Sequence, residues 1–115
     1  MKWNIYTFGA QSRVMALVVS SVVINKTLEH VTVLPVVERT QGRNIYAHEA
    51  ACVVQGPKGG GFEAIAMAHQ IRTLRRAELG DKVGGILRAV DRRRVLDALE
   101  VQLGIQIVQS EDNNE

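Results

Sequence analysis

Short apolar runs separated by turn residues are the feature of this 115-residue chain that most constrains its fold. Runs of this length that are rich in β-branched residues are typical of strands. A single helix is predicted from Arg92 to Leu103, with Asp91 as its N-cap and Gly104 as its C-cap, because apolar residues recur there at i, i+3 and i+4. Many strands followed by one helix predict a mainly β (α+β) fold, a small curved barrel capped by the helix. The strands are predicted at residues 2–8, 13–23, 30–38, 45–54, 63–69 and 82–88.

The segments between the strands are predicted as turns and loops. The run 13–23 is almost unbroken in apolar residues, so we expect a central strand that is buried on both faces. Pro35 has no backbone N–H and predicts an edge or a bulge in its strand. The pair Gly84–Gly85 predicts a bulge or a sharp bend. The connections are turns at 9–12 and 25–27, a loop at 40–44, a glycine-rich hairpin at 56–61 and one helical turn at 74–79.

Length and composition indicate one self-sufficient domain at residues 1–105, followed by an acidic, flexible tail at 106–115. The chain is 46% hydrophobic and 23% charged, which is enough apolar material for a core. Its net charge is only +2, from 14 basic and 12 acidic residues. Between residues 72 and 94, however, the sequence has eight basic residues and three acidic ones, which gives this segment a charge of +5. Such a surface suits nucleic acid or an acidic peptide, and it is equally consistent with a solvated charged face.

The remaining composition argues against a secreted, membrane-bound or metal-dependent protein. Cys52 is the only cysteine, so no internal disulfide can form, and its apolar surroundings predict a buried, inert thiol. The apolar run at 14–24 is too short to span a bilayer. His30 and His48 lack metal-ligand spacing, so neither a metal nor another cofactor is expected. We expect a cytoplasmic protein.

Local motifs along residues 1–105 resemble one family of small proteins. The opening segment 1–13 is similar to the start of CcdB, including Tyr6-Thr7 and Ser12-Arg13. Residues 68–73, Ala-His-Gln-Ile-Arg-Thr, resemble the MazF/PemK pattern, as does the ending Leu103-Gly104-Ile105. The chain thus resembles the MazF, PemK (Kid) and CcdB superfamily, the toxins of type II toxin–antitoxin systems. Further similarity is found at residues 17–21, 31–36 and 79–80. The resemblance implies an SH3-like barrel with a C-terminal helix and assembly as a homodimer.

The resemblance also implies an activity, the metal-independent and sequence-selective cleavage of single-stranded mRNA, which inhibits growth. This endoribonuclease chemistry needs a base for the 2′-hydroxyl, an acid for the leaving oxygen and a cation for the phosphorane. By analogy with the family, Arg13 would hold the scissile phosphate. His69 would act as acid or base, since imidazole changes charge near neutral pH. Glu38 is a further candidate base. The structural alternatives are a solvent-exposed arginine and a hydrogen-bonded histidine at strand ends.

RNA binding is expected from polar residues beside these groups and from aromatic rings. Arg72, Gln70 and Ser12 are the candidate RNA-binding residues, and Arg72 is also a candidate for a structural ion pair. Splayed bases of single-stranded RNA stack on aromatic side chains, and the available rings are those of Trp3, Tyr6 and Tyr46, for which core packing is the alternative. The expected protein partners are a second copy of the chain and an acidic, partly disordered antitoxin.

Several residues depart from the ribonuclease pattern and keep two alternatives open. Val37-Glu38 stands where the ribonucleases usually have threonine and serine, and Val14 replaces a proline. One alternative is a CcdB-like poison of DNA gyrase, although Leu103 replaces the tryptophan of the Trp-Gly-Ile ending. The other is a catalytically inactive barrel that binds the antitoxin.

Overall fold

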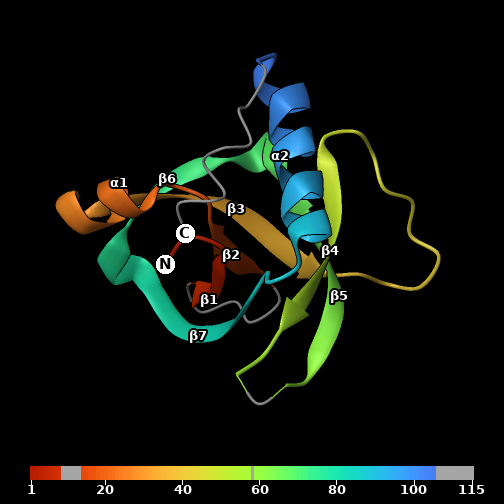
Figure 1. The fold of residues 1–115 in the computed structure, drawn as a ribbon, viewed down its shortest axis with the longest axis horizontal. Helices are drawn as coiled ribbons and strands as arrows, with labels where there is room; N and C mark the ends of the chain where they lie inside the picture. The colour runs from red at the N-terminus through yellow and green to blue at the C-terminus, as the bar shows by residue number, and fades with distance from the viewer. Residues whose placement is uncertain (9–13, 58, 106–115) are drawn as a thin grey trace.

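The computed structural model describes residues 1–8, 14–57 and 59–105. Within these residues, seven strands form one antiparallel sheet, and a long C-terminal helix packs against it (Figure 1). The strands are β1 (Asn4–Phe8), β2 (Met15–Val18), β3 (His30–Glu38), β4 (Glu49–Gln55), β5 (Gly61–Met67), β6 (Arg72–Arg75) and β7 (Leu79–Gly85). The helices are α1 (Val22–Thr27) and α2 (Ala89–Leu103), with short 3₁₀ turns η1 (Ala68–Gln70) and η2 (Arg76–Glu78).

The sheet curves into a ring because β2 pairs on both of its edges. The strand order is β2-β1-β7-β4-β5-β3-β6, and β2 also pairs with β3. The nine-residue β3 is the central strand of this arrangement, since it pairs with β2 on one edge and with β6 and then β5 on the other. The prediction of a mainly β fold with a C-terminal helix is confirmed.

Pro35 lies inside β3 without disrupting it. Residues 30–33 of β3 pair with β6, and residues 36–38 pair with β5. Pro35 therefore falls where β3 changes partner along that edge, and its missing N–H removes no ladder hydrogen bond there. It is buried and pairs with Ala16 of β2. Pro35, predicted to lie at an edge or a bulge, thus lies between the segments of β3 that pair with β6 and with β5.

The predicted strand at 13–23 is wrong in its second half. Strand β2 ends at Val18, and Val22 begins α1, so the turn predicted at 25–27 lies inside that helix. Two serines explain the break, because their side chains compete with the ladder for backbone groups. The Ser21 hydroxyl accepts from Ile24 N at 3.3 Å as the N-cap, and Ser20 Oγ accepts from Thr32 N at 3.1 Å.

Other predicted boundaries shift by a few residues. The strand predicted at 45–54 begins only at Glu49, and that predicted at 82–88 begins at Leu79 and ends at Gly85. His69 lies in η1, beyond the end of β5. The helical turn predicted at 74–79 is confined to η2, because the preceding residues extend as β6. Strands β4 and β5 pair antiparallel as far as Gln55 and Gly61, so they form a hairpin as predicted, although Gly61 already belongs to β5.

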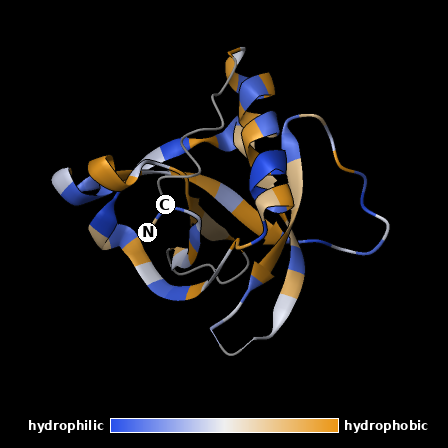
Figure 2. Ribbon diagram, viewed as in Figure 1, coloured by the Kyte–Doolittle hydropathy of each residue, from blue (hydrophilic) through white to orange (hydrophobic). Residues whose placement is uncertain are grey.

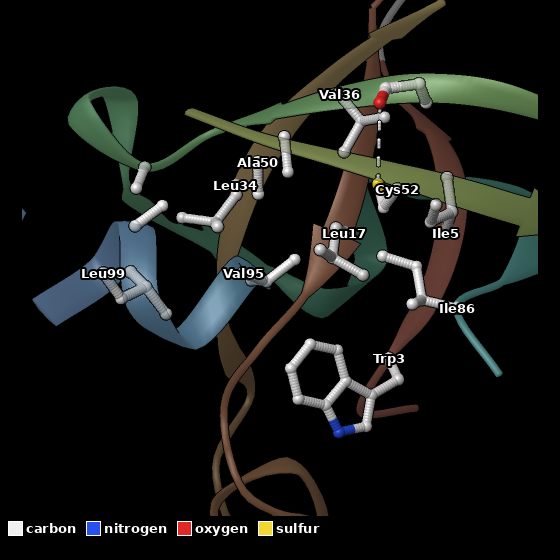
Figure 3. Close-up of a cluster of buried hydrophobic side chains, with 14 of the residues drawn as sticks. Trp3, Ile5, Leu17, Leu34, Val36, Ala50, Cys52, Ile86, Val95 and Leu99 are labelled. Atoms are coloured by element: carbon white, nitrogen blue, oxygen red, sulfur yellow. Dashed lines mark hydrogen bonds between the residues drawn. The ribbon is translucent and has the colours of Figure 1, made fainter. Parts of the chain in front are cut away.

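Helix α2 lies over β4 and closes one side of the main core. Apolar and polar residues alternate along it in Figure 2, and its buried apolar residues contact the sheet. Figure 3 shows Val95 and Leu99 of the helix among Leu17, Leu34 and Cys52 of the sheet. A second, smaller cluster joins β2, β3 and β6 through Val18, Val31, Val33, Ala16 and Leu74.

The start of α2 differs from the prediction, and its end agrees with it. Arg88 is the N-cap, and Asp91 is a fully buried residue of the first turn rather than the cap. Its carboxylate pairs with Arg88 Nε at 2.9 Å and with Arg94 Nη1 at 3.4 Å. The helix ends at Gly104, whose left-handed φ of 67° closes it with a hydrogen bond to Glu100 O. None of the helices in the described residues has the length and apolar character needed to cross a membrane.

Candidate functional site

A cavity of about 280 Å³ opens between β1, β2, β3 and β6. Most of its lining is apolar, and Arg72 is its one charged lining residue among those described. Gln70, at the end of η1, adds an amide beside the arginine. The lining residues are Phe8, Val14, Met15, Ala16, Val33, Pro35, Gln70, Arg72 and Leu74. We call this space the arginine cavity; it can hold an anionic group against a cation on an apolar floor.

Strand register places Arg72 in the arginine cavity. Strand β6 runs antiparallel to β3, with Arg72 opposite Val33 and Leu74 opposite Val31. Since side chains alternate along a strand, Arg72 and Leu74 share one face, and Thr73 and Arg75 share the other. The Arg72 guanidinium lies 5.7 Å from the centre of the Phe8 ring, at a cation–π distance. The guanidinium is thereby held on an aromatic face while remaining exposed to solvent.

Glu38 lies on a different cavity, of about 690 Å³. Its lining includes Thr7, Met15, Glu38, Thr40 and Arg43. Met15 also lines the arginine cavity, so the two cavities share this residue. Glu38 is five residues along β3 from Val33, the partner of Arg72, and five residues of strand span about 16 Å. The structure therefore separates Glu38 from Arg72.

Three rings form a row that leads up to the arginine cavity. The rings of Tyr46 and His48 are parallel within 2°, with centroids 5.7 Å apart. The ring of His69 meets that of His48 edge to face, with centroids 4.4 Å apart. His69 Nε2 lies 3.2 Å from Nε2 of Gln70, so the amide can donate to the ring when that nitrogen carries no proton. Gln70 in turn lines the arginine cavity, and the row of rings is thereby connected to the cavity.

A partly buried ion pair fixes the segment that carries Tyr46 and His48. The Glu49 side chain is nearly buried, and both of its oxygens accept from Arg43, at 2.9 and 2.6 Å. Glu49 Oε1 also accepts from the backbone N–H of Tyr46 at 3.2 Å. These hydrogen bonds, that from Arg43 above all, lower the pKa of Glu49, and the same hydrogen bond raises the pKa of Arg43. The carboxylate therefore stays charged and anchors residues 43–49 against β4.

The structure brings some of the predicted site residues together and separates others. Gln70 and Arg72 meet at the arginine cavity, and His69 adjoins Gln70. Ser12 and Arg13 lie outside the described residues, although Val14, which follows Arg13 in the chain, lines the cavity.

The three predicted stacking residues differ sharply in accessibility. Trp3 is 1% exposed and belongs to the main core, and Tyr6 is half-buried against the smaller cluster. Tyr46 is 59% exposed, so among these three its ring face is the one open to a ligand.

Sequence reasoning missed His48, Phe8 and the pair Arg43–Glu49. The available signals are weak: His48 stands two residues after Tyr46, and Phe8 is the last residue of the first predicted strand. Within residues 1–8, 14–57 and 59–105, no three His, Cys, Asp or Glu side chains gather as metal ligands would.

Comparison with solved structures shows which fold this arrangement belongs to. An endoribonuclease from a mycobacterial species superposes with a TM-score of 0.70 at 23% identity, covering 94% of each chain. A mycobacterial endoribonuclease in complex with its cognate antitoxin gives 0.70 at 24% identity, over 94% of this chain and 98% of that one. The Mycobacterium tuberculosis toxin MazF-mt6 gives 0.69 at 19% identity, over 90% and 99%. A comparison with curated protein sequences gives no significant match.

Comparison with family models identifies the family of this chain. One model, for the PemK-like, MazF-like toxins, matches residues 6–103. The matched range includes both stretches on which the sequence resemblance depends, residues 1–13 and 68–105, except for residues 1–5 and 104–105. The match does not favour the gyrase-poison alternative, and Leu103, at the position of the missing tryptophan, is a half-exposed residue of the helix end. The chain therefore belongs to the family of PemK-like, MazF-like toxins of type II toxin–antitoxin systems.

Proposed function

We propose that this toxin is an endoribonuclease that cleaves single-stranded RNA at the arginine cavity without a metal ion. The 2′-oxygen forms a bond to the adjacent phosphorus, and the bond from phosphorus to the 5′-oxygen breaks. The 2′ proton passes to a base on the protein, and the leaving oxygen takes a proton from an acid. The products are a 2′,3′-cyclic phosphate and a free 5′-hydroxyl. One observation carries the proposal: Arg72 and Gln70 meet Val14, the neighbour of Arg13, around one cavity.

Two arginines are assigned to the phosphate. Arg13 is the proposed clamp, because a planar guanidinium can donate two parallel hydrogen bonds to phosphate oxygens. Arg72 supplies a second positive charge in the arginine cavity, and the Gln70 amide beside it is a further donor. The Ser12 hydroxyl is proposed as another donor, on the family resemblance alone. Charge on the phosphorane is stabilised best by donors that are already fixed before reaction. The Phe8 ring holds Arg72 in this way, at 5.7 Å.

His69 is the proposed acid or base. It adjoins Gln70 of the arginine cavity, and its ring is exposed to solvent and substrate. Glu38 is the weaker candidate, because about 16 Å of β3 separates it from the residue opposite Arg72. A role for Glu38 requires an RNA strand that reaches both cavities.

The proposal extends to assembly and partners. A relative of this chain was solved in complex with its cognate antitoxin, which supports an antitoxin for this toxin as well. We propose an acidic, partly disordered peptide, whose charge complements the basic residues between positions 72 and 94. We also propose a homodimer that acts in the cytoplasm, where mRNA is found.

The test is incubation of purified protein with mixed-sequence single-stranded RNA in EDTA. We expect fragments that end in 2′,3′-cyclic phosphate. Arg13→Ala and Arg72→Ala should lower the cleavage rate about 100-fold or more, as removal of an oxyanion donor does. Arg75→Ala is the matched control, because Arg75 is an exposed arginine of the same strand that faces away from the cavity and lines another surface with Glu29. Equal loss in all three variants, or intact RNA with the wild-type protein, would refute the proposal.

A further inference from the structure

The row formed by Tyr46, His48 and His69 is not explained by packing. Neither buried cluster includes any of the three, and Tyr46 is 59% exposed. The chain has only five aromatic residues, so an exposed tyrosine stacked on an imidazole uses a scarce side chain at the surface. Parallel rings with centroids 5.7 Å apart are offset, which leaves part of each face uncovered. The row therefore presents flat, accessible π surface.

The backbone beneath the row is fixed on both sides. The N–H of Tyr46 donates to the buried Glu49 carboxylate, itself paired with Arg43. The N–H of Ala68 donates to His48 O at 3.0 Å, and Glu49 pairs with Met67 in the sheet. These contacts join the loop before β4 to η1, so the rings from the two segments are held together before any ligand arrives. A ligand that stacks on them has little ordering cost to overcome.

The row also has a direction, because it ends at the arginine cavity. His69 contacts Gln70, Gln70 and Arg72 line the cavity, and Arg72 lies over Phe8. From Tyr46 to Phe8, planar side chains thus follow one another from the exposed loop to the arginine cavity and its cation. A chain that alternates flat rings with phosphates matches this sequence of groups.

We infer that Tyr46, with His48 and His69 beside it, is a stacking platform for bases of single-stranded RNA that flank the scissile phosphate. The inference rests on the proposed ribonuclease activity and adds where the substrate extends beyond the cavity. Stacking on a ring face is open to any base, so the platform contributes affinity and register rather than sequence choice. An aromatic side chain of a protein partner is the competing occupant, and wild-type affinity for the RNA strand in Tyr46→Ala would favour it.

The experiment measures binding of an uncleavable strand, a single-stranded 2′-O-methyl oligonucleotide of mixed sequence that carries 2-aminopurine. Stacking quenches 2-aminopurine fluorescence, and anisotropy gives the affinity. Tyr46→Ala should weaken binding about tenfold and reduce the quenching, as loss of one stacked ring does. Tyr46→Phe is the matched control and should keep both. Because Tyr46 carries no charge, the dependence of log affinity on log salt should be unchanged in Tyr46→Ala, whereas Arg72→Ala should reduce that slope by roughly 0.7.

The outcomes distinguish this inference from the proposed activity. Wild-type affinity and quenching in Tyr46→Ala, with RNA cleavage by the wild-type protein intact, would overturn the platform alone. Equal losses in Tyr46→Ala and Tyr46→Phe would also overturn it, since the ring would then not be the contact. A wild-type protein that neither binds the strand nor cleaves RNA would overturn the ribonuclease proposal and the platform together. Melting temperatures of the variants control for folding, which an exposed side chain should not affect.

Discussion

His69 lies where the ring row meets the arginine cavity, and this position admits two roles. Its imidazole can exchange protons with the reacting oxygens, as the sequence resemblance implies. Its ring can also contribute flat surface to the row, through the edge-to-face contact with His48 at 4.4 Å. The two roles need different parts of the side chain, because proton exchange needs the ring nitrogens and stacking needs only the ring.

Replacing His69 by phenylalanine separates these roles. His69→Phe keeps a ring and removes both nitrogens, so we expect cleavage to fall about 10²- to 10⁴-fold, the usual contribution of an acid–base residue. Affinity for the uncleavable strand should stay within about twofold, whereas His69→Ala should lose affinity as well. The measurement is the single-turnover cleavage rate of the wild-type protein and of both variants at the same pH. A His69→Phe enzyme that cleaves at the wild-type rate would remove His69 from the chemistry.

At the scale of residues, sequence reasoning succeeded where the site residues are neighbours in the chain. Gln70 and Arg72 come from one short motif, and the structure brings both to one cavity. His48 could not be linked to His69 in this way, because the two are 21 positions apart in the chain. They meet through the pairing of Glu49 with Met67 and the hydrogen bond from Ala68 N to His48 O. Whether Arg13 completes the cavity stays a prediction, since it lies outside the described residues.

At the scale of elements, the predictions failed where local hydrogen bonds overrode residue preference. Strand β3 was predicted with its observed bounds, because its apolar run has no competing side chain. The run 13–23 has equally strong β preference, yet Ser20 and Ser21 end the strand and begin α1. Asp91 has the residue type of an N-cap, but its buried pairing with Arg88 places it inside the first turn of α2. These outcomes depend on which group each side chain bonds in the folded protein, and composition does not reveal that group.

The two glycines near the end of β7 give a prediction for this element. The bulge predicted there is present, since Ile5 pairs with Gly84 and the next residue, Tyr6, pairs with Lys82, leaving Val83 extra. A β-carbon on Gly84 would clash with the backbone carbonyl oxygen of Gln55, on the neighbouring strand β4. Because backbone cannot rotate away, Gly84→Ala should lower the free energy of unfolding by roughly 1–3 kcal/mol.

The control for this change is a glycine with open space around it. Gly60→Ala introduces the same methyl group where nothing lies within 4 Å, so stability should change by about 0.5 kcal/mol or less. Urea unfolding followed by circular dichroism measures both variants. Equal stability of the two would show that β7 moves away from β4 at little cost and that the contact is loose.

At the scale of the whole molecule, the main core depends on elements from both ends of the chain. Pairing of β2 with β3 closes the ring of strands, and α2 covers β4, so residues as distant as Trp3 and Val95 belong to one buried cluster. Cys52 of β4 lies within this cluster, 2% exposed, and its Sγ donates to Ala64 O at 3.8 Å (Figure 3). Its thiol therefore reports on whether the assembled core is intact.

The thiol predicts how the stability of the whole domain depends on alkaline pH. Burial, and next the negative charge of Asp91, raise the pKa of Cys52 from 9.0 to about 12. The unfolded chain then loses the thiol proton above about pH 9, while the folded protein keeps it up to about pH 12. The stability of the folded state that depends on the protonated thiol is therefore fully present below about pH 9 and is lost progressively between about pH 9 and about pH 12. Over that range the thiol lowers the free energy of unfolding by about 1.4 kcal/mol per pH unit.

Urea unfolding at pH 7 and pH 10 measures the change in the free energy of unfolding between the two pH values. Cys52→Ala provides the control, because the two proteins share every other titratable group. If the variant loses as much stability between the two pH values as the wild type does, the thiol ionises as readily in the fold as in the unfolded chain, and the core around β4 is open to water.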